Sequence, residues 1–156
     1  MELYANKEDF ITSVQKALDD TDKNWRDYKG LIIAGTHTPD NVEEKIQKIK
    51  DARRDKTPFL GICFGFQLMV IEYARSVLGK WRANTTEVDP ETNYPAIVKM
   101  KELRVGMRPT IDIWGNSSME SFWHNYKFNN EYLKDFTNDW KFTQGYDPDM
   151  GEYVVD

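Results

Sequence analysis

Residues 57–70, TPFLGICFGFQLMV, join an apolar run to a helical pattern through a single cysteine. The first six residues are typical of a buried strand, and over 64–78 the apolar residues recur as in a well-buried helix. Cys63 lies at the junction, in the pattern Gly61-x-Cys63-x-Gly65. A sharp strand-to-helix turn flanked by small residues predicts a nucleophile elbow, with Cys in the place where hydrolases of another fold carry Ser.

Two interpretations of Cys63 are open from this pattern alone. In the first, small neighbours permit a strained backbone that lifts the thiol above the sheet, and the N-terminus of the following helix favours a thiolate and an oxyanion. In the second, Cys63 is a buried structural residue, because free cysteine is among the most buried residue types. Gln67 lies four residues later, on the same side of the predicted helix, and favours the first interpretation.

The segments upstream of the cysteine alternate between helix and strand. Residues 8–19 have the apolar spacing of an amphipathic helix, and GLIIAG (30–35) is a short β-branched run that ends in glycine. Residues 41–54 are again amphipathic, with their basic residues on the solvent side. Strands and helices that alternate with short connections are typical of a parallel sheet. We therefore expect an α/β fold, doubly wound around a mainly parallel sheet with helices on both faces.

The pattern changes after residue 79, where shorter apolar runs are separated by turn residues. These runs predict additional antiparallel strands in the C-terminal half, and a short segment between them predicts one or two helical turns. The predicted strands are 94–100, 105–113, 121–129, 140–146 and 152–156, and the helical turns are at 130–136.

Length and composition limit the possible classes of protein. A chain of 156 residues is long enough for one domain with a sizeable core. Its formal net charge of −5 argues against a general nucleic-acid surface, which needs clustered Lys and Arg. A single cysteine permits no internal disulfide, and no apolar run approaches the roughly 20 residues of a membrane span. We expect no nucleic-acid partner, no membrane span and an intracellular location, cytoplasmic or in an organelle matrix.

Longer stretches around the cysteine carry a family resemblance. PFLGICFGFQLMVIEYARSVLG (58–79), followed by ANTTEVDPETNYP (83–95), closely resembles the glutamine amidotransferase domain of CTP synthase, in which an ANSTEF-like segment follows the cysteine elbow. Residues 30–65 resemble that family's GIIVPGGFG…EGKI…A…IPFLGICLG stretch. Further on, RVGMRPT (104–110) is similar to its GGTMRLG, and residues 121–136 are similar to its RHRHRYEVNN segment. The resemblance covers roughly residues 8–156.

The resemblance implies a class-I glutaminase fold and a reaction. Cys63 would attack the side-chain amide of glutamine, form a thioester and release ammonia. Glu87 would recognise the α-amino group of the substrate. A partner synthetase (amidoligase) domain would use the ammonia to convert UTP to CTP, and the resemblance implies no metal and no cofactor. The residues that it assigns to substrate binding are Gly35, Thr36, Phe64, Gln67, Glu87, Asn125 and Tyr126.

Several positions depart from the family pattern. Thr36 stands where the oxyanion loop has its second glycine, which would be costly if φ had to be positive there. Asn125 replaces the arginine that grips the substrate carboxylate, a change expected to weaken binding by roughly 1.5–3 kcal/mol. The family's catalytic histidine would follow Asp156, and neither His37 nor His124 matches its position. Residues 1–156 are thus expected to form one amidotransferase-like domain without the family's first strand and C-terminal His/Glu segment.

Two functions remain open from the sequence. The first is a CTP synthase-type glutaminase with Cys63 as its nucleophile, whose partner is glutamine together with a synthetase domain. The second is an inactive pseudo-glutaminase that serves as a structural or binding subunit of a larger assembly. The altered loop and the many aromatic residues after residue 113 favour the second, since exposed rings are common at interfaces. The retained Cys63, Gln67 and Glu87 favour the first.

Overall fold

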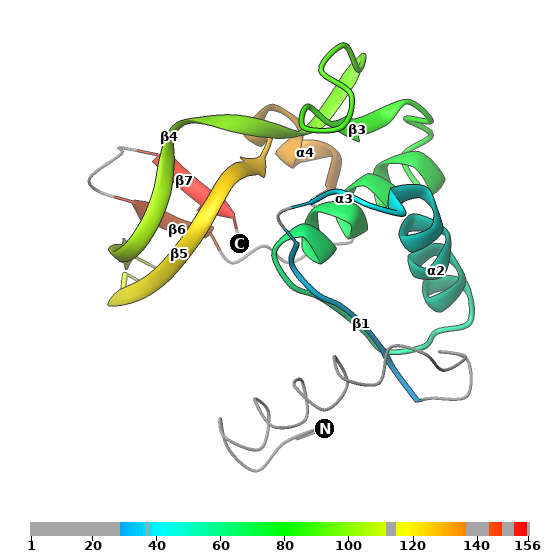
Figure 1. Cartoon of the computed structure of the whole chain (residues 1–156), viewed down its shortest axis with the longest axis horizontal. Helices are drawn as coiled ribbons and strands as arrows, with labels where there is room; N and C mark the ends of the chain where they lie inside the picture. Colours follow the sequence, from blue (N-terminus) through cyan, green and yellow to red (C-terminus); the bar gives the residue numbers. More distant parts are fainter. Residues whose placement is uncertain (1–28, 37, 112–114, 137–143, 148–151, 156) are drawn as a thin grey trace.

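The computed structural model describes residues 29–36, 38–111, 115–136, 144–147 and 152–155. These residues form an α/β structure in which two helices pack beside a small parallel sheet and a long curved hairpin extends away from them (Figure 1). The elements are β1 (Leu31–Ile33), α2 (Val42–Arg54), β2 (Phe59–Gly61), α3 (Phe64–Ser76), β3 (Ala83–Thr85), β4 (Tyr94–Ile111), β5 (Ser117–Phe128), η2 (Asn130–Tyr132), α4 (Leu133–Phe136), β6 (Gln144–Asp147) and β7 (Glu152–Val155).

The first sheet is the parallel pair β1–β2, with Leu31 opposite Phe59 and Ile33 opposite Gly61. The backbone continues this pairing past β2, because the Ile62 N–H donates to the Ile33 carbonyl at 2.9 Å. Both strands therefore end at the same edge, and α3 begins there. This is the strand–helix–strand–helix order expected from residues 30–78.

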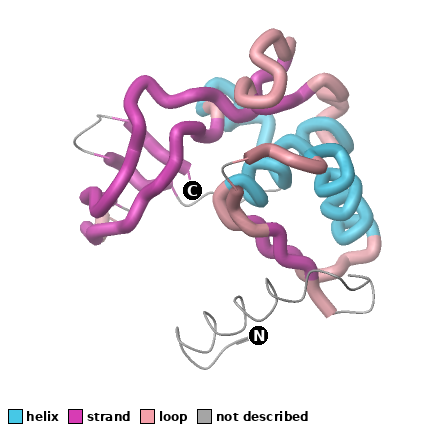
Figure 2. Tube along the Cα trace, viewed as in Figure 1, coloured by secondary structure: helices cyan, strands magenta, loops and turns pink. Residues whose placement is uncertain are grey.

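Among the described residues, the second sheet has five strands in the order β3-β4-β6-β7, with β5 paired to β4. Strands are drawn in magenta and helices in cyan in Figure 2. β3 and β4 are parallel, whereas β4–β5 and β6–β7 are antiparallel. The sequence predicted two strands at 94–100 and 105–113, and this was wrong, since β4 is one strand from Tyr94 to Ile111. The register of β4 against β5 shifts between Lys99 and Arg104. The interruption of the apolar pattern in the sequence is therefore a bulge within one strand and not a turn between two.

Helix α3 is the centre of the core. Leu68, Val70, Ile71 and Ala74 are fully buried, as expected from an apolar pattern on most sides of the helix. Helix α2 turns Ile46, Ile49 and Ala52 inward. Two ion pairs tie these helices together, Arg53 to Glu72 at 2.8 Å and Arg75 to Glu43 at 2.8 Å. These ion pairs, together with the buried apolar side chains of both helices, hold α2 and α3 in one layer.

The aromatic residues of the C-terminal half divide between core and surface. Phe122, Phe128 and Phe136 are buried, and Phe136 contacts Phe128 edge-on with ring centroids 5.2 Å apart. Trp123, by contrast, is 64% exposed. The helical turns predicted at 130–136 are present as η2 and α4. Within the described part of the chain, no helix is long and apolar enough to cross a membrane.

Some expectations fall on residues outside the described ranges. These are the helix at 8–19, His37, and most of the strand predicted at 140–146. The expectation of helices on both faces of the parallel sheet depends on the helix at 8–19, so it stays a prediction. In the described residues, parallel pairing joins β1 to β2 and β3 to β4, and the antiparallel strands predicted for the C-terminal half are present as β4 to β7.

Candidate active site at the cysteine elbow

Cys63 occupies a strained turn between β2 and α3. Its backbone has φ 53° and ψ −108°, in the positive-φ region that side chains other than glycine rarely adopt. Such conformations cost of order 1–3 kcal/mol and are concentrated at functional sites. The side chain is exposed. The interpretation of Cys63 as a buried structural residue is therefore wrong, and the elbow predicted from the sequence is present.

The glycines on either side are required by close backbone contact. A Cβ on Gly65 would lie 2.0 Å from the carbonyl oxygen of Ile33 in β1. A Cβ on Gly61 would lie 2.6 Å from the backbone carbon of Gly65. Because both neighbours are main-chain atoms, no side-chain rotation could relieve either contact. The Gly-x-Cys-x-Gly pattern thus seats the first turn of α3 directly on the parallel strands.

The first turn of α3 provides a positive environment for the thiol. Its backbone is ordered by hydrogen bonds from the Gly65 N–H to the Ile62 carbonyl (2.9 Å) and from the Gln67 N–H to the Cys63 carbonyl (3.1 Å). The turn contains no acidic residue. No acidic side chain of this turn therefore offsets the partial positive charge of the helix N-terminus, which favours negative charge on Sγ or on an oxyanion beside it.

A pocket of about 210 Å³ opens beside Cys63. It is enclosed by the elbow and α3 on one side and by β4, β5 and the loop after β3 on the other. All the site residues predicted from the sequence except Gly35 line it, and two residues that were not predicted join them. The lining residues are Thr36, Cys63, Phe64, Gln67, Glu87, Leu103, Trp123, Asn125 and Tyr126.

Gly35 lies against Cys63 and is not among the residues that line the pocket. A Cβ at Gly35 would be 3.0 Å from the Cβ of Cys63 and 3.5 Å from its Sγ. Thr36, the next residue, is not among the residues with positive φ, so the strain that a β-branched residue would suffer there does not arise. Its hydroxyl donates to the Thr38 carbonyl at 3.0 Å and accepts from the Thr38 N–H at 3.1 Å. This local turn shapes the loop without a second glycine.

Glu87 is positioned by the end of β3. Thr85 is fully buried, and its Oγ1 accepts a hydrogen bond from the Glu87 N–H at 3.2 Å. The neighbouring Thr86 N–H donates to the Ile97 carbonyl of β4 at 3.0 Å. Burial, and then the negative charge of Glu87, raises the pKa of Tyr126 above its usual value. The carboxylate of Glu87 therefore acts electrostatically across the pocket.

Gln67 presents an acceptor that has no partner among the described residues. The side chain is 7% exposed, and its Oε1 atom is buried without a hydrogen bond. An unsatisfied buried carbonyl costs about 1–3 kcal/mol. Gln67 is thus a pocket-lining residue whose side-chain carbonyl oxygen lies buried beneath the accessible surface.

Leu103 and Trp123 were missed by the sequence analysis. Trp123 lies two residues before Asn125 in β5, and the two-residue period of a strand could have pointed to it. Leu103 gave no signal, because it enters the pocket through the bend of β4. The same register shift allows the consecutive residues Asn125 and Tyr126 both to line the pocket. The side chains of His37 and His124 lie outside the described part of the structure.

The α/β fold joins a cysteine elbow to a pocket that a glutamate and a glutamine also line. Residues 6–151 match the family of class-I glutamine amidotransferases. The chain belongs to that family. Within it, the chain is of the CTP synthase type, as its curated relatives and a solved structure indicate.

The CTP synthase of Clostridium beijerinckii is 38% identical over 143 residues, which cover 80% of this chain and 27% of that protein. The CTP synthase of Sulfolobus acidocaldarius is 50% identical over 86 residues, or 55% of this chain and 16% of that protein. The chain thus spans well under a third of the length of these relatives. The glutaminase domain of Trypanosoma brucei CTPS, solved with bound acivicin, has a TM-score of 0.70 at 21% identity and covers 99% of this chain and 65% of that one. This likeness confirms the α/β fold class.

Proposed function

We propose that the pocket binds the side chain of glutamine and that Cys63 hydrolyses its amide. The Sγ of Cys63 forms a bond to the amide carbon, the carbon–nitrogen bond breaks, and the nitrogen leaves as ammonia with the thiol proton. Water then forms a carbon–oxygen bond, the thioester bond breaks, and glutamate and the thiol are released. The sum is glutamine plus water giving glutamate plus ammonia.

One observation carries this proposal. Cys63 is held at positive φ with an exposed thiol, and that thiol faces a pocket lined by Gln67 and Glu87. The carboxylate of Glu87 can pair with the substrate ammonium. Gly35, in the loop after β1, and Phe64, the first residue of α3, flank Cys63, where a backbone N–H could stabilise an oxyanion.

The ammonia requires an acceptor elsewhere. The relatives are CTP synthases of which this chain matches about a quarter, so the amination of UTP to CTP would take place on a synthetase domain that acts with this one. We place that domain outside the described residues, as a covalent neighbour or as a separate partner.

A second candidate is a pseudo-glutaminase that binds its ligand but does not turn it over. It is favoured by Asn125, which lines the pocket where the family resemblance implies an arginine for the substrate carboxylate. A neutral amide cannot form the bidentate, charge-assisted contact that an arginine would form. Such a domain would serve as a binding subunit of a larger assembly.

The experiment that tests the proposal is covalent labelling of Cys63. The protein is incubated with 6-diazo-5-oxo-L-norleucine, an electrophilic glutamine analogue, and its intact mass is measured. We expect one adduct, at Cys63, and none on Cys63→Ala protein shown to be folded by circular dichroism. The D-enantiomer is the matched control compound and should label far more slowly. Absence of the adduct on folded wild-type protein would contradict both glutamine binding and nucleophilic activity.

Release of ammonia separates the two candidates. If the labelled pocket also hydrolyses glutamine, the wild-type protein produces ammonia and glutamate in equal amounts, and Cys63→Ala produces neither. If labelling occurs without ammonia release, the pseudo-glutaminase is correct.

A further inference from the structure

We infer that the preferred ligand of this pocket is a glutamine whose α-carboxyl group is uncharged, as in the N-terminal residue of a peptide, rather than free glutamine. This inference rests on the proposed function, because it assumes that the pocket takes a glutamine side chain. It goes further by naming the substrate class, and two independent features of the pocket carry it.

The first feature is the charge of the pocket wall. Among the described residues that line it, only Glu87 carries a formal charge, and the others are neutral. A substrate ammonium placed beside Glu87 is favoured, but a carboxylate on the same carbon is brought close to a like charge. The negative charge of Glu87 is already felt by Tyr126, whose pKa it helps to raise. A ligand with an ammonium and a neutral carbonyl matches this wall better than a zwitterion does.

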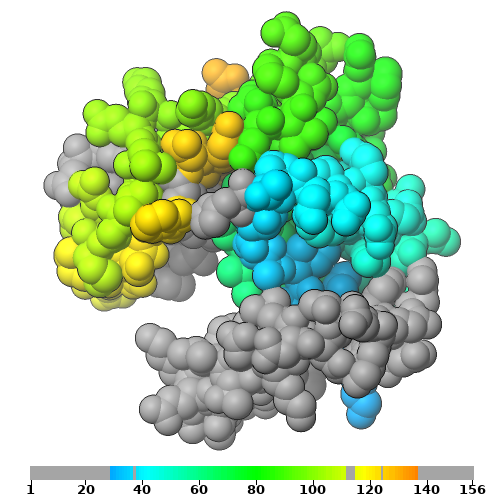
Figure 3. All heavy atoms as spheres, viewed as in Figure 1, coloured from blue at the N-terminus to red at the C-terminus, as the bar shows by residue number. Residues whose placement is uncertain are grey.

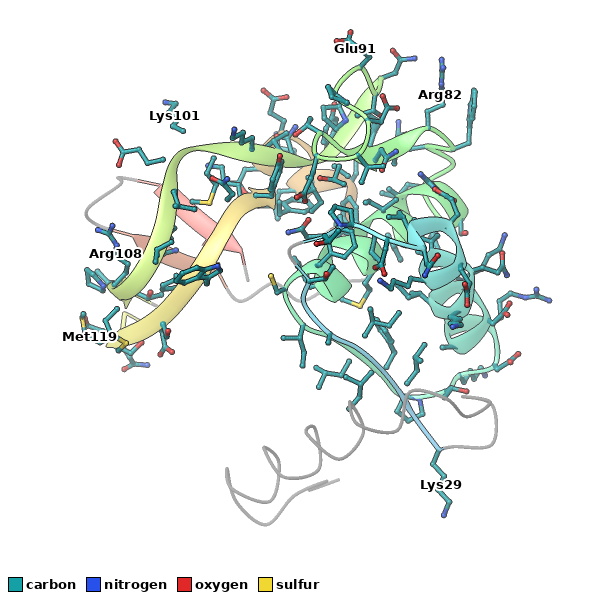
Figure 4. The ribbon with its side chains drawn as sticks, viewed as in Figure 1. Lys29, Arg82, Glu91, Lys101, Arg108 and Met119 are labelled. Atoms are coloured by element: carbon teal, nitrogen blue, oxygen red, sulfur yellow. The ribbon has the colours of Figure 1, made fainter. Side chains whose placement is uncertain are left out.

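Two basic side chains on β4, those of Arg104 and Lys101, are directed elsewhere. The guanidinium of Arg104 lies 3.4 Å from the centroid of the Phe122 ring, is 1% exposed, and donates to Thr110 Oγ1 at 3.3 Å. Lys101 projects outward from the bend of β4, away from the helices (Figure 4). Neither side chain lines the pocket. Among the described residues of β4, no lysine or arginine lines the pocket, where it could take over the role of the missing arginine.

The second feature is an apolar rim. Leu103 and Trp123 both line the pocket, and their side chains are 58% and 64% exposed. Together they form an exposed patch of large apolar side chains, which is more informative than a single exposed apolar residue. The γ-amide and the ammonium of a glutamine are small and polar, so neither group needs this surface. A residue attached to the α-carbonyl of glutamine would leave the pocket toward the rim and cover it.

The rim continues along one face of the β4–β5 hairpin. Trp123 pairs with Val105, and Met119 pairs with Pro109, so these residues share a face, as does Met107 between them. Met107 and Met119 are 58% and 56% exposed. Met119 lies at the far end of the hairpin (Figure 4), and the hairpin forms a lobe to the left of β1 and α2 in the space-filling view (Figure 3). An extended apolar peptide that starts in the pocket could follow this face.

The test compares four ligands by their protection of Cys63 against iodoacetamide, which requires binding and no turnover. The ligands are L-glutamine, its α-amide, glutaminyl-leucine amide and glutaminyl-serine amide. We expect the α-amide to protect at a concentration about tenfold or more below that of L-glutamine, because its neutral carbonyl avoids the like charge of Glu87. The leucine dipeptide should protect better than the serine dipeptide, because its side chain covers Leu103 and Trp123.

Two variants make the comparison specific. Asn125→Arg restores a cation to the wall and should reverse the order, so that L-glutamine protects better than its α-amide. Trp123→Ser should remove the advantage of the leucine dipeptide over the serine dipeptide and leave the preference for the α-amide unchanged. If the ligands protect Cys63 in the same order of strength in Asn125→Arg as in the wild type, the role assigned to the charge of the pocket-lining residues is wrong.

The outcomes separate this inference from the proposed function. If L-glutamine protects Cys63 as well as its α-amide or better, the preference for an uncharged carboxyl group is wrong and the glutaminase proposal stands. If none of the four ligands protects Cys63 and the electrophilic analogue gives no adduct, both are wrong. Protection by the α-amide and the dipeptides alone supports both.

Discussion

Replacement of Gly65 by alanine tests how the elbow is built. A Cβ at this position would lie 2.0 Å from the Ile33 oxygen and 2.8 Å from its carbonyl carbon, whereas real Cβ atoms essentially never come closer than 3.0 Å. The first turn of α3 would have to move at least 1.0 Å away from β1 to relieve the contact with the oxygen. Because this turn carries Cys63, the movement displaces the thiol from the pocket.

The expected effect has two parts. Overpacking costs about 1–3 kcal/mol when side chains can yield, and here the clashing atoms belong to a backbone that is hydrogen-bonded to Ile62. We therefore expect Gly65→Ala to lower the free energy of unfolding by about 3 kcal/mol or more, which is a large part of the 5–15 kcal/mol typical of a domain. A displacement of about 1 Å at a reacting group can slow a reaction about 100-fold, so labelling of Cys63 should slow by that order.

Gly30→Ala is the matched control. Its Cβ would lie 3.4 Å from the Pro58 oxygen, an ordinary contact, and its φ is not positive. Urea unfolding followed by circular dichroism gives the stabilities, and intact-mass kinetics with the electrophilic analogue gives the labelling rates. The reasoning is refuted if Gly65→Ala unfolds within about 0.5 kcal/mol of Gly30→Ala, the range of a neutral surface substitution, and is labelled at the wild-type rate.

Three further predictions concern charges. Arg53→Met should lower the free energy of unfolding in urea by about 3 kcal/mol because it leaves the 1%-exposed Glu72 unpaired, and adding Glu72→Leu should recover most of the loss. Burial and a hydrogen bond to a carboxylate of α4 raise the pKa of Tyr94. The stabilisation from Tyr94 is therefore complete below pH about 10 and lost above it, and unfolding measured against pH should show a shallower alkaline decline in Tyr94→Phe. Glu87→Gln should weaken ligand protection of Cys63 about tenfold or more and lower the pKa of Tyr126 in ultraviolet titration, and an unchanged pKa would contradict their coupling.

Local patterns predicted the elements near the cysteine well. The helix and strand boundaries around Cys63 differ from the predicted ones by at most two residues at each end, because the apolar period and the flanking glycines act over a few residues. The prediction for β4 was wrong because pairing with a distant strand outweighed the local pattern. The polar residues Lys101 and Glu102 interrupt its apolar pattern, yet pairing with β5 on both sides of the bend keeps the strand continuous.

The sequence by itself determined the elbow of this class-I glutamine amidotransferase domain. Gly61 and Gly65 leave room for one close crossing of strand and helix, and Cys63, the middle of the three residues between them, takes a strained conformation there. Only the tertiary structure decided what faces that thiol. Glu87, Leu103, Trp123 and Asn125 reach it through the loop after β3 and the bent β4–β5 pairing, and such long-range contacts depend on register and packing across the whole chain, which no local period encodes.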